Sequence, residues 1–222
     1  MIDLSHQLLE CTPNVSPVLM EALVRVESGW NPYAIGPDAG GAPIEQPRTL
    51  EQAIAKAKAL KASGARFSVG LAQIHVSNVA NAGVTWEDAF DACKNLALGQ
   101  KILLGNYNKA IAEGYAGVDA VWAALRGYNN GDVHRAVSDA YAQKIFAFMQ
   151  QQQQKESGAG RAVRTTPASA NPSFVSLEAV AQIQTTGVPA GVTARRVQAV
   201  PADKQRKNES PEIFQADEKQ GF

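Results

Sequence analysis

The sequence lacks any long apolar run, and it lacks an excess of charge of either sign. No apolar stretch approaches the roughly 18–20 residues that span a bilayer, so the sequence predicts no transmembrane segment. Lysine plus arginine equals aspartate plus glutamate, at 21 each. This balance, with no basic stripe of interleaved aromatics, gives no electrostatic reason to expect nucleic acid or an acidic membrane surface as a partner.

The chain also lacks the common motifs of nucleotide binding, nucleophilic hydrolysis and metal binding. There is no GxSxG, no Walker loop and no GxGxxG. The three histidines, His6, His75 and His134, form no metal-ligand spacing, and Ser68 has no visible His/Asp partners. We therefore expect no metal site and no cofactor.

Cysteine is scarce, with Cys11 and Cys93 standing 82 positions apart. This spacing excludes CxxC redox and zinc patterns. Two buried free thiols are one interpretation, and a disulfide is the other. A disulfide that closes so long a loop could contribute about 4 kcal/mol in the chain-entropy model. Composition alone does not choose between them.

The first 150 residues carry repeated helical patterns with caps and stops. They predict helices over 3–12, 16–28, 49–64, a short segment from Thr85, 91–113, 118–131 and 134–150. The stretch 65–74 breaks the pattern and is expected to be extended, with Gly70 at a tight backbone position.

The composition changes after Gln150. A glutamine run and mixtures of Gly, Ala, Ser, Thr and Pro follow, with few large apolar residues. Such a segment cannot bury enough apolar surface to offset the ordering of the chain. The sequence therefore predicts an all-α (mainly helical) domain over 1–150 and a disordered tail over 151–222.

Glu27 stands at the end of an apolar helical run, two residues before Gly29 and three before Trp30. The negative end of a helix and the apolar neighbours Val26 and Trp30 should both raise the pKa of this carboxyl group. A carboxyl group protonated near neutral pH is what a general acid in glycoside cleavage requires. The plain alternative is a solvated charge, as most glutamates near helix ends are.

Later segments supply amides and hydroxyls that suit an N-acetylated sugar. They are "SVGLAQI" (68–74), "RGYNNG" (126–131) and "DAYAQKI" (139–145). Each has a structural alternative. Asn-Asn-Gly is a strong turn signal, Tyr141 lies on an apolar stripe, and Gln73 could hold a buried backbone group. The ordered set, rather than any one residue, favours a sugar-binding groove.

The motifs "ESGWNP", "SVGLAQI", "YNNG" and the late "AY" resemble the successive motifs of the lysozyme-like lytic transglycosylases. The resemblance runs from about Leu8 to Met149 and is strongest to the small members encoded with bacterial type IV secretion systems. It implies a lysozyme-like, two-lobed helical fold with a groove for peptidoglycan glycan strands. Glu27 falls at the family's sole catalytic acid. The positions that line the groove or orient this acid are matched by Ser68, Gln73, Tyr128, Asn129 and Tyr141.

The family's chemistry implies that the acid protonates the oxygen between N-acetylmuramic acid and N-acetylglucosamine. The carboxylate then takes the proton of the C6 hydroxyl group, which attacks C1 and closes a 1,6-anhydro ring. Water is not consumed, so the enzyme would be a lyase. Two-carboxylate glycosidases hold a partner across the bond instead; the nearby candidates Asp38, Glu45 and Asp132 sit in no recognisable partner motif.

The sequence departs from the family pattern at three places. Ala72 stands where methionine is usual and Gly127 where alanine is frequent, so one wall of the groove is expected to differ. The N-terminus, "MIDLSHQLLECTPNV", has neither the basic lead nor the apolar core of a secretory signal. The family implies a periplasmic or cell-envelope location, so we expect either a start further upstream or another export route.

The resemblance also favours a disulfide between Cys11 and Cys93, because the secretion-associated members resemble the chain at both positions and work in an oxidising compartment. In the tail, "SFVSLEAVAQIQ" (173–184) has enough apolar residues to dock on a secretion-system component, with a mere spacer as the alternative. Two further functions stay open: a hydrolytic muramidase on the same fold, and a non-catalytic wall-binding assembly protein.

Overall fold

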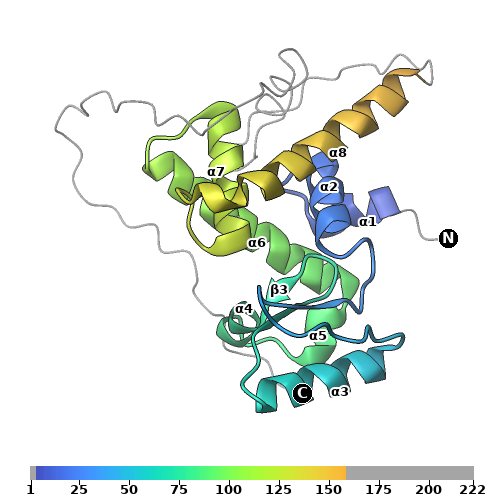
Figure 1. Cartoon of the computed structure of the whole chain (residues 1–222). Helices are drawn as coiled ribbons and strands as arrows, with labels where there is room; N and C mark the ends of the chain where they lie inside the picture. The colour runs from blue at the N-terminus through green and yellow to red at the C-terminus, as the bar shows by residue number, and fades with distance from the viewer. Residues whose placement is uncertain (1–3, 159–222) are drawn as a thin grey trace, which may run out of the picture.

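The computed structural model describes residues 4–158, which fold into two lobes joined by one long helix (Figure 1). The α-helices are α1 (Leu4–Cys11), α2 (Pro17–Glu27), α3 (Leu50–Ala62), α4 (Val76–Asn81), α5 (Trp86–Phe90), α6 (Ala92–Ala112), α7 (Gly117–Asn130) and α8 (Asp139–Gly158), with the 3-10 turn η1 (Ala136–Ser138) before α8. The strands are β1 (Ile35–Pro37), β2 (Phe67–Val69) and β3 (Ile74–His75).

The helical lobe contains α1, α2, α7 and α8 together with part of α6. Its core is made of large apolar side chains that are fully buried, among them Leu19 and Leu23 of α2 and Leu125 of α7. Trp122 of α7 stacks on Phe146 of α8 with ring centroids 5.1 Å apart. Each such side chain contributes roughly 1.5–3 kcal/mol when buried, so this packing fixes the positions at which α2, α7 and α8 end or begin.

The second lobe holds α3, α4, α5 and a small antiparallel sheet in the order β1-β2-β3. Ser68 in the central strand lies opposite Gly36 on one side and His75 on the other. Asn95 of α6, which is buried, ties the loop after β2 to the long helix. Its Nδ2 donates to the Val69 carbonyl at 3.1 Å and its Oδ1 accepts from the Ala72 N–H at 2.8 Å.

The Asn95 side chain explains why residue 70 is a glycine. A Cβ atom at Gly70 would lie 2.2 Å from the Asn95 Nδ2, and its φ of +78° disfavours other residues. The sequence predicts a tight backbone position here, at which a ligand could approach. The structure shows that the group that approaches Gly70 is the Asn95 side chain.

The prediction of a mainly helical, two-lobed fold is confirmed, and most of the predicted helices lie within a few residues of their observed bounds. Two differences concern the extended segments and the last helix. The stretch 65–74 forms two short strands with a turn between them, and β1 and α4 were not predicted. The helix expected over 134–150 begins only at Asp139 and continues to Gly158, because side-chain hydrogen bonds hold the preceding loop against the end of α7.

Cys11 and Cys93 form a disulfide that joins the end of α1 to the first turn of α6. Within residues 4–158, no helix is long and apolar enough to cross a membrane. The predicted division at residue 150 falls inside α8 and stays a prediction. Most of the predicted tail, including 173–184, lies outside the described residues.

Candidate active site

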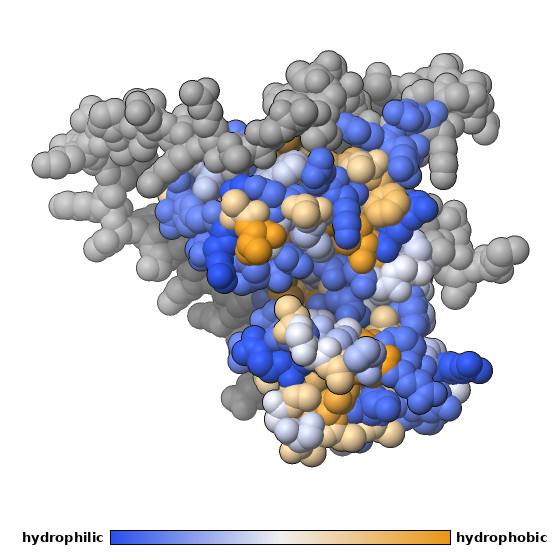
Figure 2. Space-filling view, viewed as in Figure 1, coloured by the Kyte–Doolittle hydropathy of each residue, from blue (hydrophilic) through white to orange (hydrophobic). Residues whose placement is uncertain are grey.

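A groove of about 920 Å³ runs between the two lobes and contains Glu27. One wall comes from the three strands and the start of α4, and the other from the end of α2, from α6 and α7, and from η1. Figure 2 shows a mostly hydrophilic face, with apolar residues in small separate patches. A polar groove of this size suits an extended hydrophilic ligand better than an apolar one.

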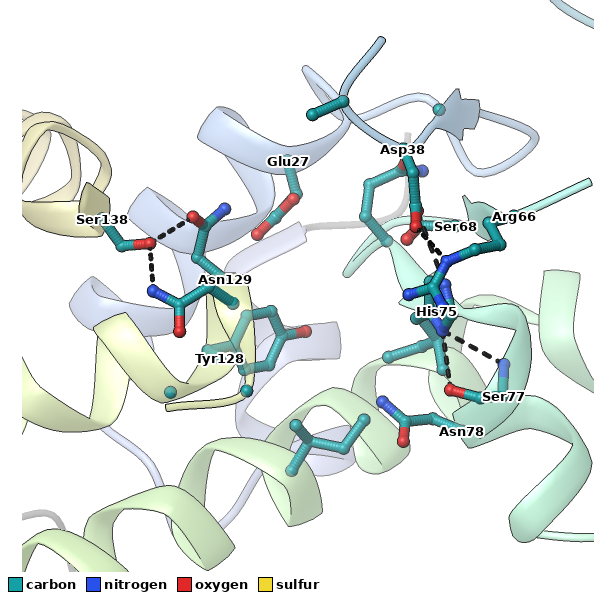
Figure 3. Close-up of a pocket in the computed structure, with 18 of the residues that line it drawn as sticks. Glu27, Asp38, Arg66, Ser68, His75, Ser77, Asn78, Tyr128, Asn129 and Ser138 are labelled. Atoms are coloured by element: carbon teal, nitrogen blue, oxygen red, sulfur yellow. Dashed lines mark hydrogen bonds and ion pairs between the residues drawn. The ribbon is translucent and has the colours of Figure 1, made fainter. Parts of the chain in front are cut away.

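Glu27 is the last residue of α2, and its carboxyl group points into the groove (Figure 3). The helix ends here because Gly29 (φ +58°) and Trp30 (φ +71°) both adopt the left-handed conformation. Burial of the side chain raises the pKa of Glu27 to about 7, although the hydrogen bond from Tyr141 lowers it. At neutral pH this carboxyl group can therefore both donate and accept a proton.

Two tyrosines flank the acid. The Tyr141 hydroxyl on α8 donates a hydrogen bond to the Glu27 Oε1. The Tyr128 hydroxyl on α7 donates to the Ala72 carbonyl at 2.6 Å, joining the two lobes beneath the groove. Burial raises the pKa of both tyrosines well above its usual value, and the charge of Glu27 adds to the shift. Both hydroxyls therefore stay protonated and remain donors.

An ion pair between buried Arg126 and partly exposed Asp139 joins the helices that carry these tyrosines. Arg126, two residues before Tyr128, donates from Nε to the Asp139 Oδ1 at 2.5 Å and from Nη2 to the Asp139 Oδ2 at 2.8 Å. The Trp122 Nε1 donates to the same carboxylate at 2.7 Å. Because Asp139 stands two residues before Tyr141, the pair aligns the start of α8 with the end of α7.

The structure brings the other predicted site residues to the same groove. Ser68 lines its strand wall, and Asn129 lies on the facing side (Figure 3). Gln73 also lines it, yet its Nε2 donates to the Ala34 carbonyl at 3.2 Å and to the Gly70 carbonyl at 2.9 Å. Gln73 thus holds backbone groups, which is the structural alternative considered above. Its Oε1 lies beside Gly36.

The two departures from the family pattern have different consequences. Ala72 is fully buried, with its methyl group packed toward Gly99, and it does not line the groove. Gly127 does line it, and a Cβ there would lie 2.3 Å from the Asn106 Oδ1. The Asn106 side chain thus occupies the space that an alanine at position 127 would need.

The sequence did not single out the charged cluster that faces Glu27 from the strand wall. Asp38 accepts a hydrogen bond from the Arg66 Nε at 2.7 Å and lies 3.4 Å from the His75 Nε2 (Figure 3). The cluster joins residues from three loops and strands, so no local spacing signals it. Glu45 and Asp132 do not line this groove, which leaves Asp38 as the second carboxylate in it among the described residues.

His75 is also in contact with a serine, as in a catalytic triad. Its Nδ1 lies 2.7 Å from the Ser77 Oγ and accepts from the Ser77 backbone N–H at 3.2 Å. The second contact caps α4, whose first residue follows His75. Because the imidazole nitrogen that faces the serine already accepts this backbone proton, we interpret the arrangement as a helix cap. The described residues contain no group of three or more His, Cys, Asp or Glu side chains placed to hold a metal ion.

Comparison with known proteins gives an independent result. A family model described as "Transglycosylase SLT domain" matches residues 6–149. The chain is 48% identical over 104 residues to "Type IV secretion system protein virB1" of Brucella suis biovar 1, which covers 47% of the chain and 43% of that protein. It is 30% identical over 147 residues to "Protein virB1" of Agrobacterium fabrum, with 64% and 57% covered.

The matched segment therefore spans less than half the length of the Brucella relative. No solved structure matches the chain.

Proposed function

The chain belongs to the Transglycosylase SLT domain family, and from this premise we propose that it cleaves peptidoglycan glycan strands with Glu27 as its general acid. The observation that supports this most strongly is the environment of Glu27. Its carboxyl group faces the groove, and its pKa of about 7 keeps part of it protonated at neutral pH. A glycosidic oxygen is a poor leaving group unless such an acid protonates it.

In the proposed reaction, Glu27 donates its proton to the oxygen that links N-acetylmuramic acid to N-acetylglucosamine. The C1–O bond breaks, and the acetamido oxygen of the substrate supports the developing positive charge. The Glu27 carboxylate then takes the proton of the C6 hydroxyl group, whose oxygen bonds to C1. A 1,6-anhydro end forms, no water is consumed, and Glu27 regains its proton for the next cycle.

The test is a mass analysis of the products that the purified chain releases from isolated peptidoglycan. A lytic transglycosylase gives ends that are lighter by one water than those of a hydrolase. Glu27→Gln is the matched control, because it keeps the shape of the side chain and removes its titratable proton. Near-normal turnover by this variant would refute the role of Glu27.

A hydrolytic muramidase is the second candidate, and the observation that favours it is Asp38 in the opposite wall of the groove. A second carboxylate could activate water or stabilise a cation. The Asp38 Oδ2, however, accepts a hydrogen bond from the Arg66 Nε, and its Oδ1 lies 3.4 Å from the His75 Nε2. Under the lyase proposal, Asp38→Asn leaves the anhydro product unchanged. If the wild-type chain releases reducing ends and Asp38→Asn does not, the reaction is a hydrolysis that depends on Asp38.

We further propose that the activity opens the cell wall locally for a type IV secretion apparatus, in the periplasm or cell envelope. The name of the similar Brucella protein, a type IV secretion system protein, supports the link to secretion. Residues 159–222 would bind a component of that apparatus. A chain ending at Gly158 should then cleave isolated peptidoglycan normally and yet fail to support secretion in cells. Full secretion would show that these residues are a spacer, the alternative to an arm that recruits the enzyme.

A further inference from the structure

Asn129 in the groove is the end of a chain of side-chain hydrogen bonds that starts at the backbone. The Asp132 N–H donates to the Asn130 Oδ1 at 2.8 Å. The Asn130 Nδ2 donates to the Ser138 Oγ at 2.7 Å and, at 3.5 Å, to the Arg135 carbonyl. The Ser138 Oγ in turn donates to the Asn129 Oδ1 at 2.6 Å.

The backbone groups fix the orientation of the Asn130 amide, and the hydrogen bond from the Ser138 Oγ to the Asn129 Oδ1 gives the direction of the last bond. A backbone N–H can only donate and a carbonyl oxygen can only accept, so the Asn130 amide has one allowed orientation. Its Nδ2 therefore gives a proton to Ser138. The Ser138 hydroxyl is left with a single proton, which it donates to Asn129. The Asn129 Oδ1 is thereby held on the side of Ser138.

The other end of the Asn129 amide consequently faces the groove. Figure 3 shows Asn129 between Ser138 and the side of the pocket where Glu27 lies. Within the described part of the chain, the Asn129 Nδ2 has no acceptor of its own. Ser138 is buried, with 2% of its surface exposed, so water has little access to the serine end of the bond, although Asn129 itself is exposed.

We propose that Ser138 is a positioning residue, which with Asn130 orients the Asn129 amide so that its NH₂ group donates to an acetamido carbonyl oxygen of the glycan. This inference rests on the proposed function for the nature of the ligand. A carbonyl oxygen is the strongest neutral acceptor on an N-acetylated sugar. An asparagine in the opposite orientation would present a carbonyl to it and repel it.

Asn130→Asp gives a sharp test because it reverses the chain while keeping its shape. A carboxylate at position 130 accepts the Ser138 proton, so the Ser138 Oγ becomes an acceptor and the Asn129 amide turns its Oδ1 to the groove. Ser138→Ala merely frees the amide. Asn108→Asp, on the exposed face of α6 and outside the groove, is the control for the added charge.

Binding of N-acetylglucosamine oligomers is measured by calorimetry, with N-deacetylated oligomers as the comparison. We expect Asn130→Asp to bind the acetylated oligomers about tenfold more weakly, as one lost hydrogen bond implies, and Ser138→Ala to lie between it and the wild type. Asn130→Asp should lose the preference for acetylated oligomers and Ser138→Ala should reduce it, while Asn108→Asp keeps it. In turnover of peptidoglycan, KM should rise while the pH profile of kcat, set by Glu27, does not move.

The amide orientation is read independently from nuclear Overhauser contacts. In the wild-type protein, the Asn129 NH₂ protons should show no contact to the Ser138 β protons, and Asn130→Asp should create one. A wild-type contact of this kind overturns the inference, as do variants that lose thermal stability but keep affinity and acetyl preference. A wild-type chain with the assigned orientation that binds no glycan would refute the proposed function instead.

Discussion

The Tyr141 hydroxyl donates a hydrogen bond to the Glu27 carboxyl group across 114 positions of sequence. The pKa of Glu27 is therefore subject to two opposing effects, burial and this hydrogen bond. Burial disfavours the carboxylate and raises the pKa of Glu27, whereas the tyrosine favours the carboxylate and lowers it. The larger effect is burial, and the resulting pKa of about 7 lets Glu27 act first as an acid and then as a base.

Removal of this hydrogen bond should move the pH dependence of cleavage. In Tyr141→Phe the influence that lowers the Glu27 pKa is absent, so the pKa rises above about 7. Cleavage requires the protonated acid, and its fall at alkaline pH should therefore occur at a higher pH than in the wild type. The measurement is kcat/KM as a function of pH on solubilised glycan strands.

Tyr128→Phe is the matched control, since it removes a hydroxyl that donates to the Ala72 carbonyl rather than to Glu27. It should lower thermal stability and leave the alkaline limb in place. If kcat/KM falls at the same alkaline pH in Tyr141→Phe as in Tyr128→Phe, the proposed influence of Tyr141 on the Glu27 pKa is wrong.

The burial of Glu27 should also cost stability at alkaline pH. A carboxyl group whose pKa rises from 4.5 unfolded to about 7 folded binds its proton more tightly in the folded state. Its contribution is therefore fully present below pH 4.5 and is lost as the pH rises to about 7. Since each pKa unit is worth about 1.4 kcal/mol, the loss is at most about 3 kcal/mol.

Glu27→Gln, which carries no charge at any pH, should thus be more stable than the wild type at pH 8 by up to that amount. At pH 4 the two proteins should differ little. Urea unfolding at both pH values provides the test, and an equal difference at the two pH values would show that Glu27 is not buried as described.

The disulfide between Cys11 and Cys93 should leave no reactive thiol in protein isolated from its native compartment. Thiol titration of the unfolded, unreduced chain measures this directly. Replacing both cysteines by alanine should lower the free energy of unfolding by up to about 4 kcal/mol, because the 82-residue loop then opens in the unfolded chain. Two titratable thiols would argue against the bond and against an oxidising location.

The ion pair between Arg126 and Asp139 should support the fold beneath the two tyrosines. Arg126 is 3% exposed, so Asp139→Asn leaves a buried guanidinium without its carboxylate and should cost about 3 kcal/mol. The arginine lowers the pKa of Asp139 below 3.8. This contribution is therefore present above about pH 4 and is lost as the pH falls further through the folded pKa.

Asp88→Asn is the comparison, because it breaks a pair outside the groove whose cation, Lys94, is exposed, while an amide oxygen at position 88 can still accept the Thr85 N–H of the capping box. Exposed pairs contribute little, so its unfolding curve should stay close to that of the wild type. Asp139→Asn would contradict the structural role of the pair if it behaved in the same way.

Much of the fold follows from local patterns in the sequence. The apolar spacing and the cap before 49–64 predict α3, and the Thr49 hydroxyl does accept the Gln52 N–H at 3.3 Å. Glu27 at the end of a helix follows equally from the glycine after it. The short strand β1 could not be predicted, because its three residues carry no period and pair only with β2, about 30 residues further along the chain. β3 lies at the end of the stretch 65–74 that was predicted to be extended, and it pairs with β2 across a short turn.

The sequence by itself determined most of the helices, where Glu27 stands on its helix, and which amides and hydroxyls are available. Caps, stops and apolar periods act within a few residues, so they can be read locally. Tertiary structure alone decided that Glu27 is buried enough to reach a pKa of about 7 and that Asp38 is paired with Arg66. It also decided that Ser138 orients Asn129. Desolvation, charge pairing and the direction of a hydrogen bond depend on groups that only the packed chain brings together.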